Sequence, residues 1–402
     1  MQELIRDLIQ KNDTRIIMIV LDGIGGLPIN GKTELEAAKT PNLDSLARES
    51  ACGLHIPVSW GITPGSGPGH LGIFGYDPIK YQIGRGILEA LGLGLDVKKT
   101  DIAVRCNYAT LRDGVIVDRR AGRIPTEQSR RLTERLRKEI NRIDEAEIIF
   151  APGMEHRFVV LIRFPEPVSP EAAMLPDTDP QKEGKKPLKA EPLSRPAERV
   201  SKVVEKLINL SHIILKEEEK ANFVLMRGFS VMPHLPSFEE AFGLKALAIA
   251  TYPMYRGLAR LVGMDTPPVD GDIKEEIDYL MERYKEYNFF FLHVKKTDSY
   301  GEDGNFDGKV KRIEEFDRHL PEIMGIGPDV LIITGDHSTP SLLKSHSWHP
   351  VPLLLKSAYV LGGLSSRFTE RECLRGELGI LPAYQILPLA LANSLRLKKF
   401  GA

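Results

Sequence analysis

The sequence is poor in the features that mark secreted, membrane-spanning or nucleic-acid-binding proteins. It contains three cysteines. They are odd in number and far apart, which argues against a disulfide framework and favours a reducing cytoplasm. No apolar run approaches the ~20 residues needed to span a bilayer, and the N-terminus lacks the apolar stretch of a signal peptide. The formal net charge is -1, so the charge balance does not favour nucleic acid or a membrane surface as a partner. The oligomeric state stays open.

The length and the order of patterns predict two domains. A chain of 402 residues is too long for one simple core. Strand-like apolar runs alternate with helical patterns in both terminal parts, which predicts an α/β fold with a mainly parallel sheet covered by helices. The middle of the chain has shorter strand-like runs and a polar loop over 176–196, rich in Pro and Lys. We therefore predict a discontinuous α/β domain, 1–80 plus 235–402, interrupted by an inserted α+β domain, 85–225.

The individual elements follow from the same periodicities. The expected strands of the α/β part cover residues 16–21, 246–251, 288–294 and 330–334. The clearest helical patterns cover residues 127–143, 196–216, 273–287 and 308–320.

Acidic and histidine side chains follow the expected strands. Asp22 ends the first apolar run, and Asp336-His337 closes a second run far along the chain. Asp298 follows another strand, and His346 lies a short distance after His337. One Asp after a strand is usually a turn residue. Several together are different, because ligands bind at the carboxyl ends of strands in open α/β folds. The pattern therefore predicts one metal site built from both ends of the chain.

Ser66 lies in a loop of unusual composition, Thr63-Pro64-Gly65-Ser66-Gly67-Pro68-Gly69-His70. A serine hydroxyl is a poor nucleophile unless its pKa is lowered or its proton is taken, and coordination to a metal lowers it. Flanking glycines let the backbone approach a phosphate closely. Phosphoryl transfer depends on positioning and charge stabilisation, which such parts supply. Spacing alone does not separate a hydrolase from a mutase or a kinase, and most Gly/Ser/Pro loops are only connectors.

Taken in order, the motifs resemble the cofactor-independent phosphoglycerate mutases of the archaeal type, within the alkaline phosphatase superfamily. The resemblance covers nearly the whole chain, and its strength lies in the joint order of motifs that are individually weak. The motifs are Leu21-Asp22-Gly23, residues 38–44, Pro64-Gly65-Ser66, Gly75-Tyr76-Asp77-Pro78, Gly84-Arg85-Gly86, residues 118–124, Asp177-Thr178-Asp179-Pro180, residues 334–340 and residues 398–402.

The resemblance implies interconversion of 3-phosphoglycerate and 2-phosphoglycerate, a step of glycolysis and gluconeogenesis, without 2,3-bisphosphoglycerate. It implies two divalent ions, Mn²⁺ or Mg²⁺, and a nucleophilic Ser66 that becomes phosphoserine. The inserted domain would close over the substrate. The implied ligands of one metal are Asp22, Ser66, Asp336 and His337; those of the other include Asp298 and His346. The implied substrate-binding residues are Asp118, Arg119, Arg120 and Arg123.

Four departures from the family pattern keep other functions open. Glu302 stands where the family has a metal-binding histidine, so it is either a carboxylate ligand or points away. His70 and His349 are additional imidazoles, which would replace the lost ligand, act as acid or base, or serve a structural role. Arg256 stands where the family tends to have a catalytic lysine, and arginine is not geometrically equivalent. The alternatives are a metal-dependent phosphomonoesterase, a small-molecule phosphotransferase or kinase, and a metal-stabilised binding protein.

Overall fold

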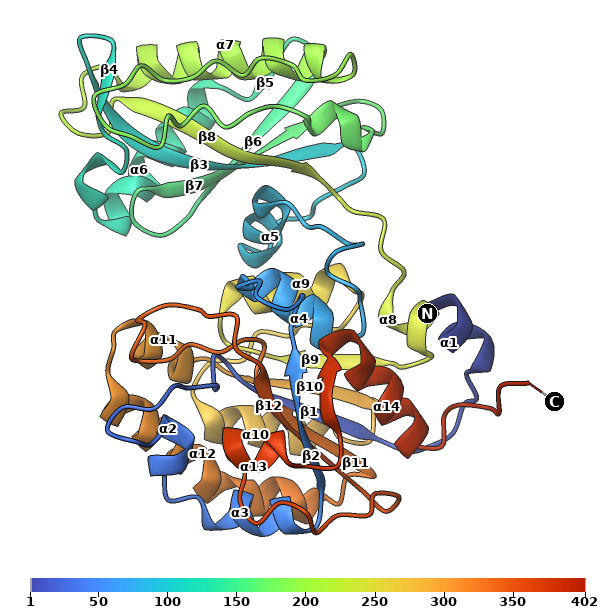
Figure 1. Cartoon of the computed structure of the whole chain (residues 1–402). Coiled ribbons are helices and arrows are strands. Elements are labelled where there is room, and N and C mark those ends of the chain that lie inside the picture. The colour runs from blue at the N-terminus through green and yellow to red at the C-terminus, as the bar shows by residue number, and fades with distance from the viewer. Residues whose placement is uncertain (1, 402) are drawn as a thin grey trace. The chain divides into compact units, whose positions relative to one another are not determined.

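The computed structural model describes residues 2–401, and the chain folds as two compact units (Figure 1). Unit 1 comprises Met1–Gln82 and Leu235–Ala402, and unit 2 comprises Ile83–His234. The predicted fold class, an α/β sheet interrupted by an α+β segment, is confirmed. The roles predicted for the two domains stay predictions at this point.

Unit 1 is built on a seven-stranded sheet with the order β13-β2-β12-β11-β1-β10-β9. Its four strands from β11 to β9 are parallel, whereas β12 runs antiparallel to both β11 and β2. Every residue of β1, β10 and β11 is buried, as expected for parallel strands covered on both faces. The strands are β1 (Ile16–Leu21), β2 (Ala51–Ile56), β9 (Ala246–Ile249), β10 (Phe289–Val294), β11 (Val330–Thr334), β12 (Val351–Ser357) and β13 (Gly379–Pro382).

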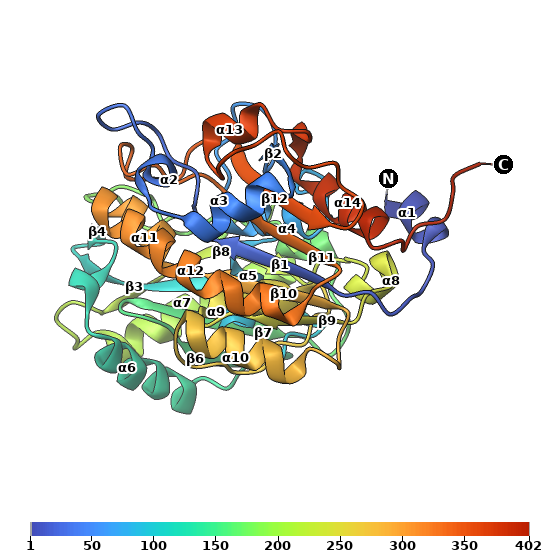
Figure 2. The same cartoon turned by 90° about the horizontal axis from the view of Figure 1, so that it is seen from below.

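Helices cover both faces of this sheet (Figures 1 and 2). One face packs against α3, α10, α12 and α13 in a continuous apolar core. The other face lies under α4, α9 and α14. The helices of unit 1 are α1 (Gln2–Leu8), α2 (Glu34–Ala37), α3 (Pro41–Arg48), α4 (Ser66–Ile73), α8 (Phe238–Phe242), α9 (Pro253–Leu261), α10 (Ile273–Arg283), α11 (Lys296–Glu302), α12 (Phe306–Ile326), α13 (Glu370–Leu374) and α14 (Ile386–Asn393).

Two helices of unit 1 differ in length from the sequence prediction. The helix expected over 308–320 is α12, which begins earlier, where Asn305 accepts a cap hydrogen bond from the Gly308 amide at 2.9 Å. It continues past Pro321 to Ile326 and is capped by Gly327, whose φ of 71° is favourable for glycine. The helix expected over 273–287 stops at Arg283.

Unit 2 is built on an antiparallel sheet with the order β4-β3-β7-β6-β5, and β8 pairs with β3. Helices α6 and α7 bury one face in an apolar core, and α7 crosses that face in Figure 1. The other face meets α5. The elements are α5 (Arg85–Gly92), β3 (Asp101–Arg112), β4 (Val115–Asp118), α6 (Thr126–Glu139), β5 (Arg142–Ile143), β6 (Ala146–Pro152), β7 (Arg157–Arg163), α7 (Ala197–Leu215) and β8 (Phe223–Val231).

The prediction of a helix over 127–143 is wrong at its C-terminal end. Helix α6 ends at Glu139, the next residue is extended, and Arg142 and Ile143 pair with β6. Strand pairing therefore overrides the local helical pattern at its end. The polar loop over 176–196 is held on unit 2 by Thr178, whose side-chain oxygen accepts from the Met226 amide at 2.8 Å. The loop thereby brings Asp177 and Asp179 to the sheet.

Among the described residues, no helix is long and apolar enough to cross a membrane. Cys52, Cys106 and Cys373 are buried and form no disulfide in the part of the chain that the structure describes.

Candidate metal and active site

The parallel strands of unit 1 bring ligand-type side chains to one edge of the sheet. Strands β1, β10 and β11 lie next to each other and run in the same direction, so the residues that follow them meet at their carboxyl ends. Asp22 follows β1, and Asp336 and His337 follow β11. Asp298 lies in α11, directly after β10. Residues far apart in the sequence thus become neighbours.

The first group of ligand-type atoms consists of Asp22, Asp336 and His337. All three residues are fully buried. His337 Nε2 lies 3.1 Å from Asp336 Oδ2 and 3.4 Å from Asp22 Oδ1. None of these three atoms has a hydrogen-bond partner among the described residues. Buried polar atoms are normally paired, so three such atoms converging fit a divalent cation.

Thr339 sets the tautomer that a metal-binding histidine needs. Its hydroxyl donates to Asp298 Oδ1 at 2.7 Å and lies 2.9 Å from His337 Nδ1. Because the single hydroxyl hydrogen points to Asp298, His337 Nδ1–H donates to Thr339. Nε2 is then the ring nitrogen that faces Asp22 and Asp336, an arrangement common at metal-ligating histidines.

The charges in this group support the same reading. Burial alone would raise the pKa of Asp336, but His337 and His70 hold that pKa well below its usual value. Burial alone would lower the pKa of His337, but Asp336 raises it to about 9. The carboxylates are therefore ionised and attract positive charge.

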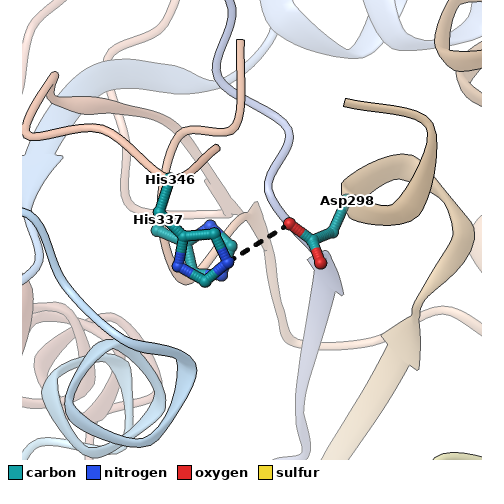
Figure 3. A group of neighbouring side chains, drawn as sticks. All are labelled: Asp298, His337 and His346. Carbon is teal, nitrogen blue, oxygen red and sulfur yellow. Dashed lines mark ion pairs between the residues drawn. The ribbon is translucent and has the colours of Figure 1, made fainter. Parts of the chain in front are cut away.

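The second group consists of Asp298, His337 and His346 (Figure 3). His346 Nε2 lies 3.5 Å from Asp298 Oδ1, and the two imidazole rings stack with centroids 3.6 Å apart. Glu302 lies one helical turn after Asp298 on α11, and its Oε1 is 3.7 Å from His346 Nε2. Its side chain is 53% exposed. Glu302 therefore borders the second group without being enclosed in it.

Ser66 is the first residue of α4 and is half-buried. Its side chain is within hydrogen-bonding reach of Tyr255, whose hydroxyl donates to Asp22 Oδ2 at 2.6 Å. The following turn packs tightly, because a Cβ at Gly69 would clash with the carbonyl of Asp336. Ser66 therefore stands at the positive end of a helix, joined to the first group by one tyrosine.

The two additional histidines fall in different places. His70 is fully buried, and its Nδ1 lies 2.9 Å from the Ser66 carbonyl and 3.1 Å from Asp336 Oδ2. It therefore adjoins the first group and not the second, where the family histidine is missing. His349 Nδ1 lies 3.1 Å from Ser347 Oγ, and its ring stacks on Trp348. His349 joins neither of the two groups that the described residues form.

In unit 2, two of the four predicted substrate-binding residues serve local structure. Asp118 accepts from the amides of Arg120 and Gly122, both at 2.7 Å. Arg119 binds Asp179 through two hydrogen bonds of 2.6 and 2.7 Å. Arg120 and Arg123 are exposed.

A second set of polar residues in unit 2 was not anticipated from the sequence. Arg105 and Asn107 are two residues apart on β3 and therefore lie on the same face of the sheet. Asn107 is paired in register with Arg157 of β7. Asn107 Oδ1, Arg157 Nε and His156 Nδ1 are buried atoms without hydrogen-bond partners among the described residues. Arg105 Nε also lacks a hydrogen bond but forms an ion pair with Glu89 Oε2 of α5 at 3.3 Å. Burial and the adjacent Arg157 lower the pKa of His156 to about 4. We call Arg105, Asn107 and Arg157 the arginine face.

Comparison with known proteins decides the family. The family model described as "2,3-bisphosphoglycerate-independent phosphoglycerate mutase" matches residues 47–221. A relative from Aquifex aeolicus, described as "Probable 2,3-bisphosphoglycerate-independent phosphoglycerate mutase", is 62% identical over 406 residues and covers 100% of both chains. The chain belongs to this family. The resemblance seen in the motifs is thereby confirmed.

Solved structures agree with this assignment to the 2,3-bisphosphoglycerate-independent phosphoglycerate mutases. The cofactor-independent phosphoglycerate mutase of Thermoplasma acidophilum is 31% identical, with a TM-score of 0.76 over 95% of this chain and 100% of that chain. A protein from Pyrococcus horikoshii is also 31% identical, with a TM-score of 0.82 over 98% of this chain and 100% of that one.

Three site residues of this phosphoglycerate mutase family member were missed in the sequence. Lys295 Nζ lies 3.1 Å from Asp22 Oδ2 and forms an ion pair with Asp298. His293 Nε2 lies 3.4 Å from the same Asp22 oxygen, and the Tyr255 ring contacts the rings of His293 and His70 with centroid distances of 3.9 and 4.6 Å. His293 lies within the buried strand β10, and Tyr255 lies on the buried face of α9, so nothing in the sequence distinguished either from a core residue. Only the position of Lys295 directly after a strand was a usable signal.

The hydroxyl of Tyr255 is expected to orient Asp22 so that Oδ1, not Oδ2, faces the first group. Tyr255→Phe should raise the Kd for Mn²⁺ by about ten-fold, the lower range for loss of a residue that orients a metal ligand. Calorimetric titration of chelated protein would measure the change.

The matched control is Tyr76→Phe, because Tyr76 is equally buried in unit 1 but donates to the Pro236 carbonyl at 2.9 Å. It should leave the Mn²⁺ affinity unchanged. Equal effects of both variants on affinity would contradict the orienting role of Tyr255.

Proposed function

We propose that this protein interconverts 3-phosphoglycerate and 2-phosphoglycerate through a phosphoserine at Ser66. Family membership supports the reaction. The observation that carries the proposal is the convergence of unpartnered, buried ligand atoms from Asp22, Asp336 and His337 near this serine. We also propose the cytoplasm as the location, which the three free thiols support.

We propose that Asp22, Ser66, Asp336 and His337 hold one divalent ion and that Asp298, His346 and Glu302 hold another. Mn²⁺ or Mg²⁺ suits these oxygen-rich sets better than a softer metal. When bound, such ions lower the pKa of the serine hydroxyl and stabilise negative charge on phosphate oxygens.

In the proposed reaction, the Ser66 oxygen attacks the substrate phosphorus, and the bond from phosphorus to the glycerate oxygen breaks. The serine proton ends on that glycerate oxygen, so glycerate and phosphoserine are the products of the first half. In the second half, the other glycerate hydroxyl takes the phosphoryl group and Ser66 regains a proton. Arg256 has a buried Nε without a hydrogen-bond partner among the described residues, and would stabilise the transferring phosphoryl group.

Substrate recognition is proposed to use unit 2. The guanidinium groups of the arginine face suit carboxylate or phosphate oxygens, and the ion pair of Arg105 with Glu89 would then open to admit the substrate anion. The exposed Arg120 and Arg123 stay candidates, whereas Asp118 and Arg119 would act by holding the nearby loop. We propose that unit 2 is the substrate-closing domain and that it excludes water, since water would otherwise hydrolyse phosphoserine.

The proposed reaction is tested with 3-phosphoglycerate in an enolase-coupled assay, using chelated enzyme re-supplied with Mn²⁺. We expect 2-phosphoglycerate to form without free phosphate, and both chelation and Ser66→Ala to abolish its formation. Phosphate release that depends on Ser66, without isomerisation, would replace the mutase proposal with a phosphatase. Mutase activity retained by Ser66→Ala would overturn the proposed phosphoserine intermediate.

Glu302 is expected to complete the second metal group. Glu302→Gln should raise the Kd of the weaker of two Mn²⁺ ions by about ten-fold. Loss of a residue that only supports a metal ligand already weakens metal binding by about this factor, and loss of the charge on a ligand should cost at least as much. The melting temperature should stay unchanged, since the side chain is exposed. Asp303→Asn, the same change one residue later and also exposed, is the control; a Kd equal to that of wild type would place Glu302 outside the site.

The arginine face is expected to bind an anionic group of the substrate. A charge-assisted hydrogen bond contributes about 1.5–3 kcal/mol, so Arg105→Met should raise KM roughly ten- to a hundred-fold. Mn²⁺ affinity should not change, because Arg105 belongs to unit 2. Arg137→Met, on the exposed side of α6, should leave KM unaltered. An unchanged KM in Arg105→Met would remove this face from substrate recognition.

A further inference from the structure

Lys309 is a fully buried lysine behind the metal-type groups, and the reaction does not use it. It lies on α12 and has no exposed surface. An ammonium group has three hydrogen-bond donors, and all three are used on backbone carbonyls. Nζ donates to the carbonyls of Gly23 at 2.9 Å, Gly25 at 3.1 Å and Thr339 at 2.9 Å.

These three carbonyls belong to the two segments that carry the first group of ligands. Gly23 and Gly25 follow Asp22 after β1, and Thr339 follows Asp336 and His337 after β11. The segments also bond to each other, because the Thr339 amide donates to the carbonyls of both glycines, at 3.2 and 3.1 Å. The ammonium of Lys309 therefore sits at the junction of the two segments.

The same junction reaches the second group through Thr339. The Thr339 carbonyl accepts from Lys309, while its hydroxyl contacts Asp298 and His337, as described above. Helix α11 packs directly on this point, since a Cβ at Gly301 would clash with the Thr339 carbonyl. One residue thus links the buried ammonium to ligand-type side chains of both groups.

The counter-charge of Lys309 comes from Glu34 of α2, which is bonded to the segment after β11. Glu34 is fully buried, and its Oε1 lies 3.8 Å from Lys309 Nζ. The same oxygen accepts from the Ser341 amide at 2.9 Å, two residues beyond Thr339. Both partners of the ion pair, Lys309 and Glu34, are therefore hydrogen-bonded to the segment after β11. Three carbonyl oxygens that converge on one point repel one another, and a positive charge with three donors offsets this repulsion better than a neutral group.

We propose that Lys309 is a positioning residue, a tethered cation that sets the spacing between the two metal-type groups without touching any of their ligands. The inference rests on the proposed function, in that it takes these groups to bind divalent ions. Loss of the ammonium releases the segments after β1 and β11 together, so both ions bind more weakly. A lysine that served only the stability of the fold would not change metal affinity in the folded protein.

The test is calorimetric titration of chelated, full-length Lys309→Met with Mn²⁺, alongside its melting temperature. Methionine has a similar length and no charge. We expect the Kd for both ions to rise about ten-fold or more, as for loss of other residues that support metal ligands. The control is Ile323→Ala on the same helix: Ile323 is fully buried in the apolar core of unit 1. It should lower the melting temperature and leave both Kd values unchanged.

Several outcomes separate the possibilities. Kd values of Lys309→Met equal to those of wild type, with a lowered melting temperature, would overturn the inference. If Lys309→Met does not fold, Lys309→Gln, which keeps two donors but no charge, is judged by the same two Kd values. Wild-type protein that binds two Mn²⁺ ions without isomerising 3-phosphoglycerate would refute the proposed function and leave the role of Lys309 standing. Wild-type protein that binds no Mn²⁺ would refute both.

Discussion

Two buried carboxylates, Asp22 and Asp336, create the constraint on which the rest of unit 1 depends. Removing an ion from water costs several kcal/mol even after relaxation, unless positive charge and hydrogen bonds replace the water. The fold supplies imidazoles from His70 and His337 and the ammonium of Lys295. Even so, one oxygen of each carboxylate keeps no hydrogen-bond partner among the described residues. These two oxygens are the atoms that the proposed divalent ion would bind.

This arrangement depends on the order of strands in the sheet. With β1 between β10 and β11, Asp22 receives neighbours from both sides: His293 and Lys295 from β10, and His337 from β11. The antiparallel β12 has a further consequence. It starts at the edge where β11 ends, so the segment joining them stays at the site and carries His346. Tight packing of α4 at Gly69 then brings Ser66 to the same edge.

Much of the α/β fold could be predicted from the sequence, because its apolar runs alternate with helical patterns. Part of the site could be predicted as well, because Asp and Asp-His that recur at the ends of several strands are typical of a metal site. Polar residues whose role depends on being buried could not be predicted in this way. Lys309 falls in a helical pattern where a lysine normally faces solvent, and only the tertiary fold turns it inward. Arg105 falls in a strand whose alternation does not say which face is covered. Conversely, Arg119 belongs to a family motif, yet its guanidinium is engaged by Asp179. The sequence shows charge but not the partner that neutralises it.

The geometry around His337 explains why the departure at Glu302 matters. His337 belongs to both groups, yet one imidazole has only one nitrogen free for a cation here, because Nδ1 is held by Thr339. If Nε2 serves the first group, where it lies nearest to Asp336, the second group keeps only Asp298 and His346 as enclosed ligands. A divalent ion needs more donors than these two. Glu302 is the carboxylate next to His346, and its exposure lets it swing toward an ion. A histidine at this position would offer a nitrogen instead, so under the proposed assignment the glutamate would make the second group richer in oxygen ligands and favour harder ions.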